Sequence, residues 1–225
     1  MLMTKLFTLI AAAMMAASVQ AQVITFTAGE KPAEGFANGA FKLTYVDTDG
    51  KIAVDGNNCY FGTEEAQTKF EARLKTGGKS SSKNNLTATV PSDGVLKICV
   101  RTGSNSATDR TLVLTQDETE LFNQVVEESS KKLVKGMDES DPEKETSVYP
   151  VISVAVKAGD VAITYPVGSM NFYAFEFVSG GEDAAVKTIG LSGAQRGQTY
   201  NLAGQKVGDG FRGIAIRDGK KVVMK

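Results

Sequence analysis

The chain has 225 residues, of which 42% are hydrophobic and 23% are charged, a balance that supports a packed core and argues against intrinsic disorder. The formal net charge is -1 and the Lys and Arg residues are scattered along the sequence, which argues against nucleic acid as a partner. The sequence contains no His, which excludes Ser-His-Asp triads, Cys-His pairs and His-based zinc sites.

The first residues have the pattern of a signal peptide. Lys5 precedes an apolar run over 6–17, and small residues at Val19 and Ala21 stand just before Gln22. The apolar run is too short for a membrane anchor, which takes about 20 residues. We therefore expect residues 1–21 to be cleaved, no membrane span, and a protein that is secreted or located at the cell surface or in the periplasm.

From residue 22 onward the dominant hydrophobic period is two. The runs "VITFTA", "FKLTYV", "LTATV", "LKICV", "TLVLT", "VISVAVK", "VAITYP" and "NFYAFEFV" alternate, and Gly, Asn, Asp, Ser or Pro bounds each of them. Many short strands separated by turns are typical of antiparallel sandwiches or barrels. The pattern predicts an all-β protein with an antiparallel, jelly-roll-like β-sandwich over 22–179.

Two segments depart from this period. The stretch "TEEAQTKFEARLKTGG" (63–78) predicts a short helix that Thr63 caps and a Gly pair ends. The stretch "LVLTQDETELFNQVV" (112–126) is compatible with a helix, but its strand-rich neighbourhood favours two strands around a turn at 117–119.

The two cysteines, Cys59 and Cys99, have two interpretations. In an exported protein an even number of cysteines favours a disulfide, which would close a loop of about 40 residues and stabilise the fold by roughly 3–4 kcal/mol. The alternative is two separate buried thiols that behave as small apolar groups. We favour the disulfide.

Charged residues flank the loop "TGSNSAT", which contains Asn105. The strand before the loop ends in Arg101, and the strand after it begins with Asp109 and Arg110, so we expect these charges to meet at one end of a sheet. Guanidinium and carboxylate groups pair well with sugar hydroxyls, and an aromatic face such as Tyr60 or Tyr165 packs against a pyranose ring. The alternative is an Arg–Asp network that only closes a hairpin, since exposed ion pairs usually serve no ligand.

Catalysis and metal binding have little support in the sequence. A glycosidase needs two carboxylates roughly 5–10 Å apart, and Glu176 with Asp109 or Asp160 are candidates without a recognisable motif. The acidic stretch "VDTDGKIAVDG" lacks the ligand set of a calcium-binding hand. We expect a non-catalytic protein with no metal and no cofactor.

The composition changes at "SGGEDAAVKT", which marks a linker at 180–185 before a small β module at 186–225. Within this module, "YNLAGQKV" and "GIAIRDGKKVVMK" resemble the C-terminal sorting segment of secreted Bacteroidota proteins that use type IX secretion. Ala215 stands where that family usually has Tyr. The resemblance implies secretion machinery as a partner and display at the cell surface. Its pattern is carried by Tyr200, Asn201, Gly204, Gln205, Val207, Gly213, Ile214, Ile216, Gly219, Lys220, Val222 and Val223.

The stretch "KAGDVAITYPVGSMNFYAFEFV" is similar to jelly-roll carbohydrate-binding modules that accompany secreted pectate lyases. The resemblance implies a glycan as ligand, and a glycan-binding protein is our first hypothesis. A structural or adhesive surface protein is the alternative, and a polysaccharide-active enzyme is less favoured. The matching positions are Gly159, Val161, Ile163, Tyr165, Asn171, Phe172, Tyr173, Phe175 and Phe177.

Overall fold

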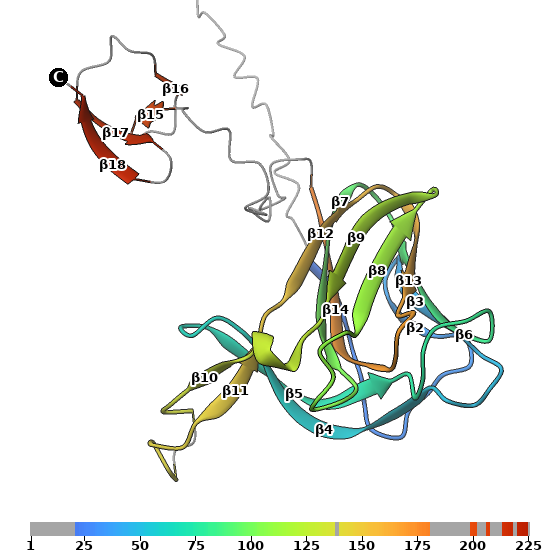
Figure 1. Cartoon of the computed structure of the whole chain (residues 1–225). Coiled ribbons are helices and arrows are strands. Elements are labelled where there is room, and N and C mark those ends of the chain that lie inside the picture. The colour runs from blue at the N-terminus through green and yellow to red at the C-terminus, as the bar shows by residue number, and fades with distance from the viewer. Residues whose placement is uncertain are drawn as a thin grey trace, which may run out of the picture. The chain divides into compact units, whose positions relative to one another are not determined.

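The computed structural model describes residues 21–137, 140–180 and the strands 199–201, 206–207, 213–217 and 220–224 (Figure 1). The chain separates into two compact units, Met1–Val186 and Lys187–Lys225. Except for Ala21, the predicted leader lies outside the described residues, as does the predicted linker except for Gly180.

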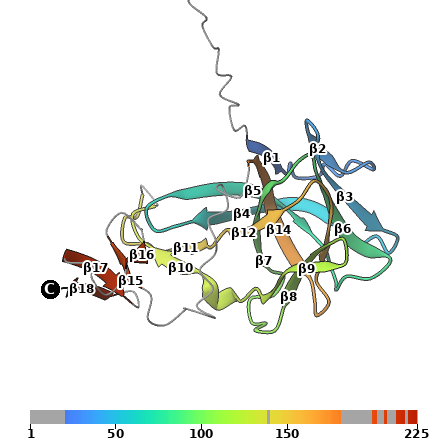
Figure 2. The same ribbon diagram turned by 90° about the horizontal axis from the view of Figure 1, so that it is seen from above.

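The first unit is a β-sandwich, which confirms the predicted fold class (Figures 1 and 2). One sheet has the strand order β10-β11-β4-β5-β14-β7-β12, with β1 also paired to β14, and the other has the order β2-β3-β6-β13-β8-β9. Strand pairing in these two sheets is antiparallel except between β11 and β4, among the described residues. The strands of the first sheet are β1 (Ala21–Thr25), β4 (Ala53–Gly62), β5 (Gln67–Lys75), β7 (Gly94–Thr102), β10 (Lys132–Val134), β11 (Thr146–Tyr149), β12 (Ile152–Val156) and β14 (Met170–Ser179). Those of the second are β2 (Phe36–Asn38), β3 (Phe41–Asp47), β6 (Asn84–Val90), β8 (Thr111–Gln116), β9 (Thr119–Val125) and β13 (Gly159–Thr164).

Alternating side chains fill the space between the two sheets. In β7, Leu96, Ile98 and Val100 are buried in the main core, while Lys97 and Arg101 lie on the other face of the sheet, as the period of two predicts. Burial of branched and aromatic side chains in this layer provides the main stabilisation of the fold.

Strand β14 contains a β-bulge that changes which aromatic side chains share a face. The register with β7 shifts between Phe172 and Ala174, so Phe172 joins Phe175 in the main core with ring centroids 5.3 Å apart. Tyr173 instead belongs to a second cluster. An uninterrupted period of two would place Tyr173 and Phe175 on one face, but the extra residue of a bulge breaks that period.

The second cluster packs on the outer face of the first sheet. Cys99 and Ala174 are register partners in β7 and β14, and each is adjacent in sequence to a residue of the main core, so the two point to the opposite side of the sheet. Parts of β4, β5 and β11 extend beyond the sandwich (Figure 1), and β4 and β11 contribute Cys59, Phe61 and Tyr149 to this cluster. The buried members of the second cluster are Cys59, Phe61, Cys99, Tyr149, Tyr173 and Ala174.

The helix expected at 63–78 is replaced by a strand. Thr63 does form a cap-like turn, since its hydroxyl accepts hydrogen bonds from the N–H groups of Glu65 and Ala66 at 3.3 and 3.2 Å. The chain then continues as β5, paired with β4 over most of its length. Pairing within the sheet outweighs the local helical preference, which is worth only fractions of a kcal/mol per residue.

The hairpin expected at 112–126 is confirmed. Strands β8 and β9 pair on either side of Asp117 and Glu118, whose φ values are 47° and 63°. Positive φ at both central residues is the geometry of a two-residue turn that matches the twist of the flanking strands.

The second unit, described by itself, forms a four-stranded antiparallel sheet of order β16-β15-β17-β18. Its strands are β15 (Thr199–Asn201), β16 (Lys206–Val207), β17 (Gly213–Arg217) and β18 (Lys220–Met224). The small C-terminal β module expected from the sequence is present.

Helical structure is nearly absent from the described residues. The described part of the chain contains no α-helix, and its one helical turn is the 3-10 turn η1 (Glu128–Ser130). No helix among the described residues has the length and apolar character needed to cross a membrane.

Candidate functional site

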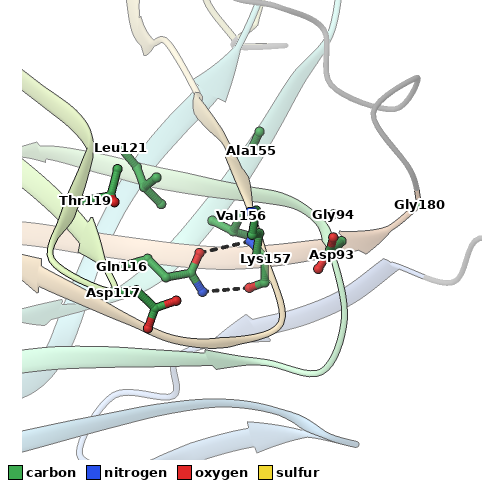
Figure 3. Close-up of a pocket in the computed structure, with 10 residues that line it drawn as sticks. All are labelled: Asp93, Gly94, Gln116, Asp117, Thr119, Leu121, Ala155, Val156, Lys157 and Gly180. Carbon is green, nitrogen blue, oxygen red and sulfur yellow. Dashed lines mark hydrogen bonds between the residues drawn. The ribbon is translucent and has the colours of Figure 1, made fainter.

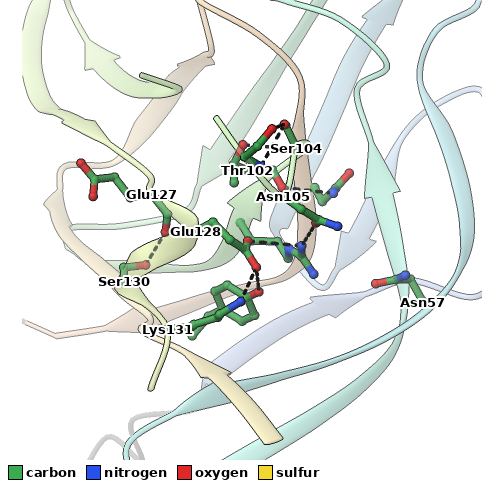
Figure 4. A network of polar contacts seen from close by, with 12 residues as sticks. Asn57, Thr102, Ser104, Asn105, Glu127, Glu128, Ser130 and Lys131 are labelled. Carbon is green, nitrogen blue, oxygen red and sulfur yellow. Dashed lines mark hydrogen bonds and ion pairs between the residues drawn. The ribbon is translucent and has the colours of Figure 1, made fainter. Parts of the chain in front are cut away.

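A cleft of about 400 Å³ lies where β4, β7 and β11 come close to the turn η1 (Figure 4). It contains three of the residues that the sequence predicted for ligand binding, Tyr60, Arg101 and Asn105. Its described lining residues are Asn58, Cys59, Tyr60, Arg101, Asn105, Glu128, Lys131, Thr146, Ser147 and Tyr149.

Arg101 is the central side chain of this cleft and is 16% exposed. Its Nη2 donates a hydrogen bond to Asn105 Oδ1 at 2.7 Å and lies 3.3 Å from Glu128 Oε2. Its guanidinium carbon lies 5.0 Å from the ring centroid of Tyr149, a cation–π contact. Burial alone lowers the pKa of Arg101, but Tyr149 and Glu128 outweigh burial and raise it, so the group is a permanent cation.

Glu128 carries the negative charge of the cleft and is 15% exposed. Its Oε1 accepts hydrogen bonds from the Tyr149 hydroxyl at 2.6 Å and from Lys131 Nζ at 2.9 Å. Burial raises the pKa of Glu128, but these hydrogen bonds and the charge of Arg101 outweigh burial and hold the pKa below its usual value. Burial, followed by the hydrogen bond to Glu128, raises the pKa of Tyr149, so its hydroxyl remains a donor.

The sequence did not identify Glu128, Lys131 or Tyr149 as site residues. Tyr149 lies in β11, which runs parallel to β4 with Tyr149 opposite Phe61, and Glu128 belongs to η1, the turn between β9 and β10. A parallel pairing between strands so far apart in the sequence leaves no local signal, so composition or spacing could not have revealed it.

The predicted meeting of Arg101 with Asp109 and Arg110 was wrong. Arg101 lies in β7 of the first sheet, whereas Arg110 directly precedes β8 of the second sheet. Arg110 Nη1 donates to the carbonyl oxygen and hydroxyl of Ser169 at 3.3 and 3.2 Å, and it covers Gly168 so closely that an added Cβ would lie 2.0 Å from it. The loop between the strands crosses from one sheet to the other, so the charges at its two ends separate.

Tyr165, which the sequence predicted as a ligand contact, lies in the main core instead. Its side chain is fully buried in the main core, and its hydroxyl donates to Asn84 Oδ1 at 2.6 Å. Asp109 is exposed, with a backbone carbonyl that accepts a hydrogen bond from the Thr111 hydroxyl. Neither side chain lines the Arg101 cleft.

The disulfide favoured by the sequence is not formed, since Cys59 and Cys99 are free, buried thiols. Strands β5 and β14 lie between their strands, β4 and β7, in the order of the sheet. Both side chains pack into the second cluster, where burial raises the pKa of Cys99 to about 12 and also raises that of Cys59. The alternative interpretation, two buried thiols that act as apolar groups, describes the structure.

The acidic residues considered for catalysis or metal binding have other partners. Glu176 forms an ion pair with Lys97 at 2.9 Å, and Asp160 accepts a hydrogen bond from Thr89 at 2.6 Å. The Asp47 carboxylate accepts backbone hydrogen bonds through one oxygen and pairs with a lysine through the other. Within the described ranges, no three Cys, Asp or Glu side chains gather as a metal site would require.

A second cavity of about 400 Å³ lies between the tip of the β8–β9 hairpin and the end of β12 (Figure 3). Gln116 projects from β8 into it, and its amide exchanges two hydrogen bonds with the backbone of Lys157. Asp93 accepts a further backbone hydrogen bond from Ala158. The Gln116 amide and one Asp93 oxygen are therefore paired with backbone groups of the residues that follow β12.

No protein-family model matches the sequence, and no curated protein matches it either. Among solved structures, the chain is similar to one from work on glycan recognition by the Ruminococcus flavefaciens cellulosome, with a TM-score of 0.37 and 12% identity over 71% of this chain and 94% of that chain. It is also similar to an adhesin domain of Lys-gingipain from Porphyromonas gingivalis, with a TM-score of 0.39 and 12% identity over 72% and 99% of the two chains. A third is the catalytic unit of an α-1,3-glucanase from Streptomyces thermodiastaticus, with a TM-score of 0.34 and 14% identity over 62% of this chain and 26% of that chain. Likenesses of this size do not identify what this chain binds.

Proposed function

We propose that this chain is a non-catalytic β-sandwich protein that binds a glycan in the cleft around Arg101. The observation that carries the proposal is the grouping of a half-buried guanidinium, an ionised carboxylate, an amide and an ammonium in one cleft. Sugar hydroxyls both donate and accept hydrogen bonds, and bonds to charged partners are the stronger ones.

Tyr60 and Tyr149 are the aromatic residues among the described lining residues of the cleft. Tyr60 is half-buried and lines the cleft beside Asn58, while Tyr149 lies beneath Arg101. Ligand sites commonly combine aromatic walls with a few polar groups that fix orientation. Glu128 is the single carboxylate among the described lining residues, whereas glycoside hydrolysis usually takes two. This favours binding over catalysis.

Binding to immobilised or gel-embedded polysaccharides tests the proposal. Arg101→Ala and, separately, Tyr60→Ala should abolish retention. Arg110→Ala is the matched control, because it removes the same side chain from a position outside the cleft. Thermal unfolding of each variant checks that the protein remains folded. Unchanged retention of Arg101→Ala would refute this site.

We also propose that the protein acts after export, at the cell surface or in the periplasm, and that the C-terminal module engages secretion machinery. The signal-peptide pattern and the sorting-like segment support this. N-terminal sequencing of protein recovered outside the cytoplasm should begin at Gln22. An N-terminus that retains residues 1–21 would contradict cleavage.

A further inference from the structure

We infer that the Arg101 cleft selects uncharged sugars and discriminates against sugars that carry a carboxylate, with Glu128 as the residue that sets this preference. The inference rests on the proposed glycan binding and specifies its ligand class. Glu128 already occupies the position between the two cations of the cleft, Arg101 and Lys131.

Both cations have an internal partner before any ligand arrives. Lys131 Nζ lies 2.9 Å from Glu128 Oε1, and Arg101 Nη2 lies 3.3 Å from Glu128 Oε2. Glu128 and Lys131 approach each other across the same helical turn (Figure 4). An acidic sugar would have to displace a carboxylate that the fold holds in place, or bind beside it against its repulsion.

The hydrogen-bonding capacity that remains suits hydroxyl groups. Arg101 Nε and Glu128 Oε2 are the two buried side-chain polar atoms of the described residues that lack a hydrogen-bond partner. One is a donor and the other an acceptor, and they belong to paired side chains. A hydroxyl can donate to one atom and accept from the other, whereas a carboxylate can only accept and would leave Glu128 Oε2 without a hydrogen-bond donor.

In this proposal, a sugar hydroxyl reaches the pair at the position of Asn105. Both atoms are buried, and the exposed Asn105 is hydrogen-bonded to the Arg101 guanidinium. A sugar hydroxyl that replaces the Asn105 amide preserves the hydrogen bond to Arg101 while it gains contact with Glu128. The ionised state of Glu128 is favoured by the hydrogen bonds from Tyr149 and Lys131, so the discrimination persists at neutral pH.

The test compares neutral polysaccharides, namely galactan, xyloglucan and galactomannan, with polygalacturonate and alginate in affinity electrophoresis and calorimetry. The decisive variant is Glu128→Gln, which removes the charge but keeps an oxygen for Tyr149. Glu127→Gln is the matched control, because it removes the same charge from the adjacent residue. Glu127 is exposed, its carboxylate accepts a hydrogen bond from the Ser129 hydroxyl, and its side chain points away from Glu128 (Figure 4).

We expect the unmodified protein to bind at least one neutral polysaccharide and to leave polygalacturonate and alginate unbound. Glu128→Gln should gain affinity for the acidic polymers by about tenfold, the size expected for removing one nearby like charge in a half-buried site. Glu127→Gln should not gain it. Equal or tighter binding of acidic polymers by the unmodified protein, or an unchanged preference in Glu128→Gln, would overturn the inference while leaving glycan binding intact. Failure to bind any polysaccharide would overturn the proposed function and the inference together.

Discussion

Gln116 makes a contact between the two sheets that can be tested by substitution. It is the last residue of β8, and the residue is 6% exposed. Its Nε2 donates to the Lys157 carbonyl oxygen at 2.7 Å, and the Lys157 N–H donates to its Oε1 at 2.9 Å. Lys157 directly follows β12, the strand at one edge of the first sheet. The Gln116 amide therefore bonds to this edge as the peptide group of a neighbouring strand would.

The Gln116→Ala substitution removes both hydrogen bonds. A net value of about 0.5–1.5 kcal/mol for each gives a loss of about 1–3 kcal/mol in the free energy of unfolding. Because Lys157 is exposed, water replaces part of the loss, and we expect about 1–2 kcal/mol. For a domain of this size, that loss corresponds to a fall in melting temperature of about 2–8 °C.

The Gln116→Glu substitution tests the donor half of the contact separately. At neutral pH the carboxylate still accepts from the Lys157 N–H, but it meets the Lys157 carbonyl oxygen as a second acceptor. This repulsion raises the pKa of the new carboxyl in the folded state above its unfolded value of about 4.3. A raised folded pKa means that the protonated form stabilises the fold, so the deficit relative to the unmodified protein is large at neutral pH and shrinks as the pH falls through the folded pKa.

Urea unfolding of the unmodified protein and both variants at neutral pH and at about pH 4 provides the measurement, with the difference from the unmodified protein compared at each pH. Gln116→Ala should show the same deficit at both pH values. A Gln116→Glu variant as stable as the unmodified protein at neutral pH, or one whose deficit grows on acidification, would refute the two-bond contact.

Two further predictions concern residues that the sequence had assigned to a ligand or to a disulfide. Tyr165→Phe removes the hydroxyl that donates to buried Asn84, so urea unfolding should show a free energy of unfolding lower by about 1–2 kcal/mol. Polysaccharide retention should be unchanged. Loss of retention at full stability would instead assign Tyr165 to the ligand site. Cys59 and Cys99 are free and buried, so neither should react with a thiol-labelling reagent in the native protein. Both should react after denaturation without reductant. Denatured protein with no reactive thiol would show that a disulfide forms.

Local sequence patterns determined the strands and much of their orientation. In β7, the alternation of Leu96, Ile98 and Val100 with polar residues was sufficient to assign the two faces, because successive side chains of a strand point to opposite sides. The β8–β9 hairpin was equally accessible, since its turn residues lie between two β-rich runs.

Only the tertiary structure decided how these strands combine. The bulge in β14 moved Tyr173 to the outer face, and the pairing of β5 with β4 replaced an expected helix. The crossing between sheets separated Arg101 from Arg110, the parallel pairing of β11 with β4 brought Tyr149 to Arg101, and the turn η1 placed Glu128 beside it. A period of two records which side of a strand is buried, but the choice of partner strand depends on burial and hydrogen bonding between segments distant in the sequence, which no local pattern contains.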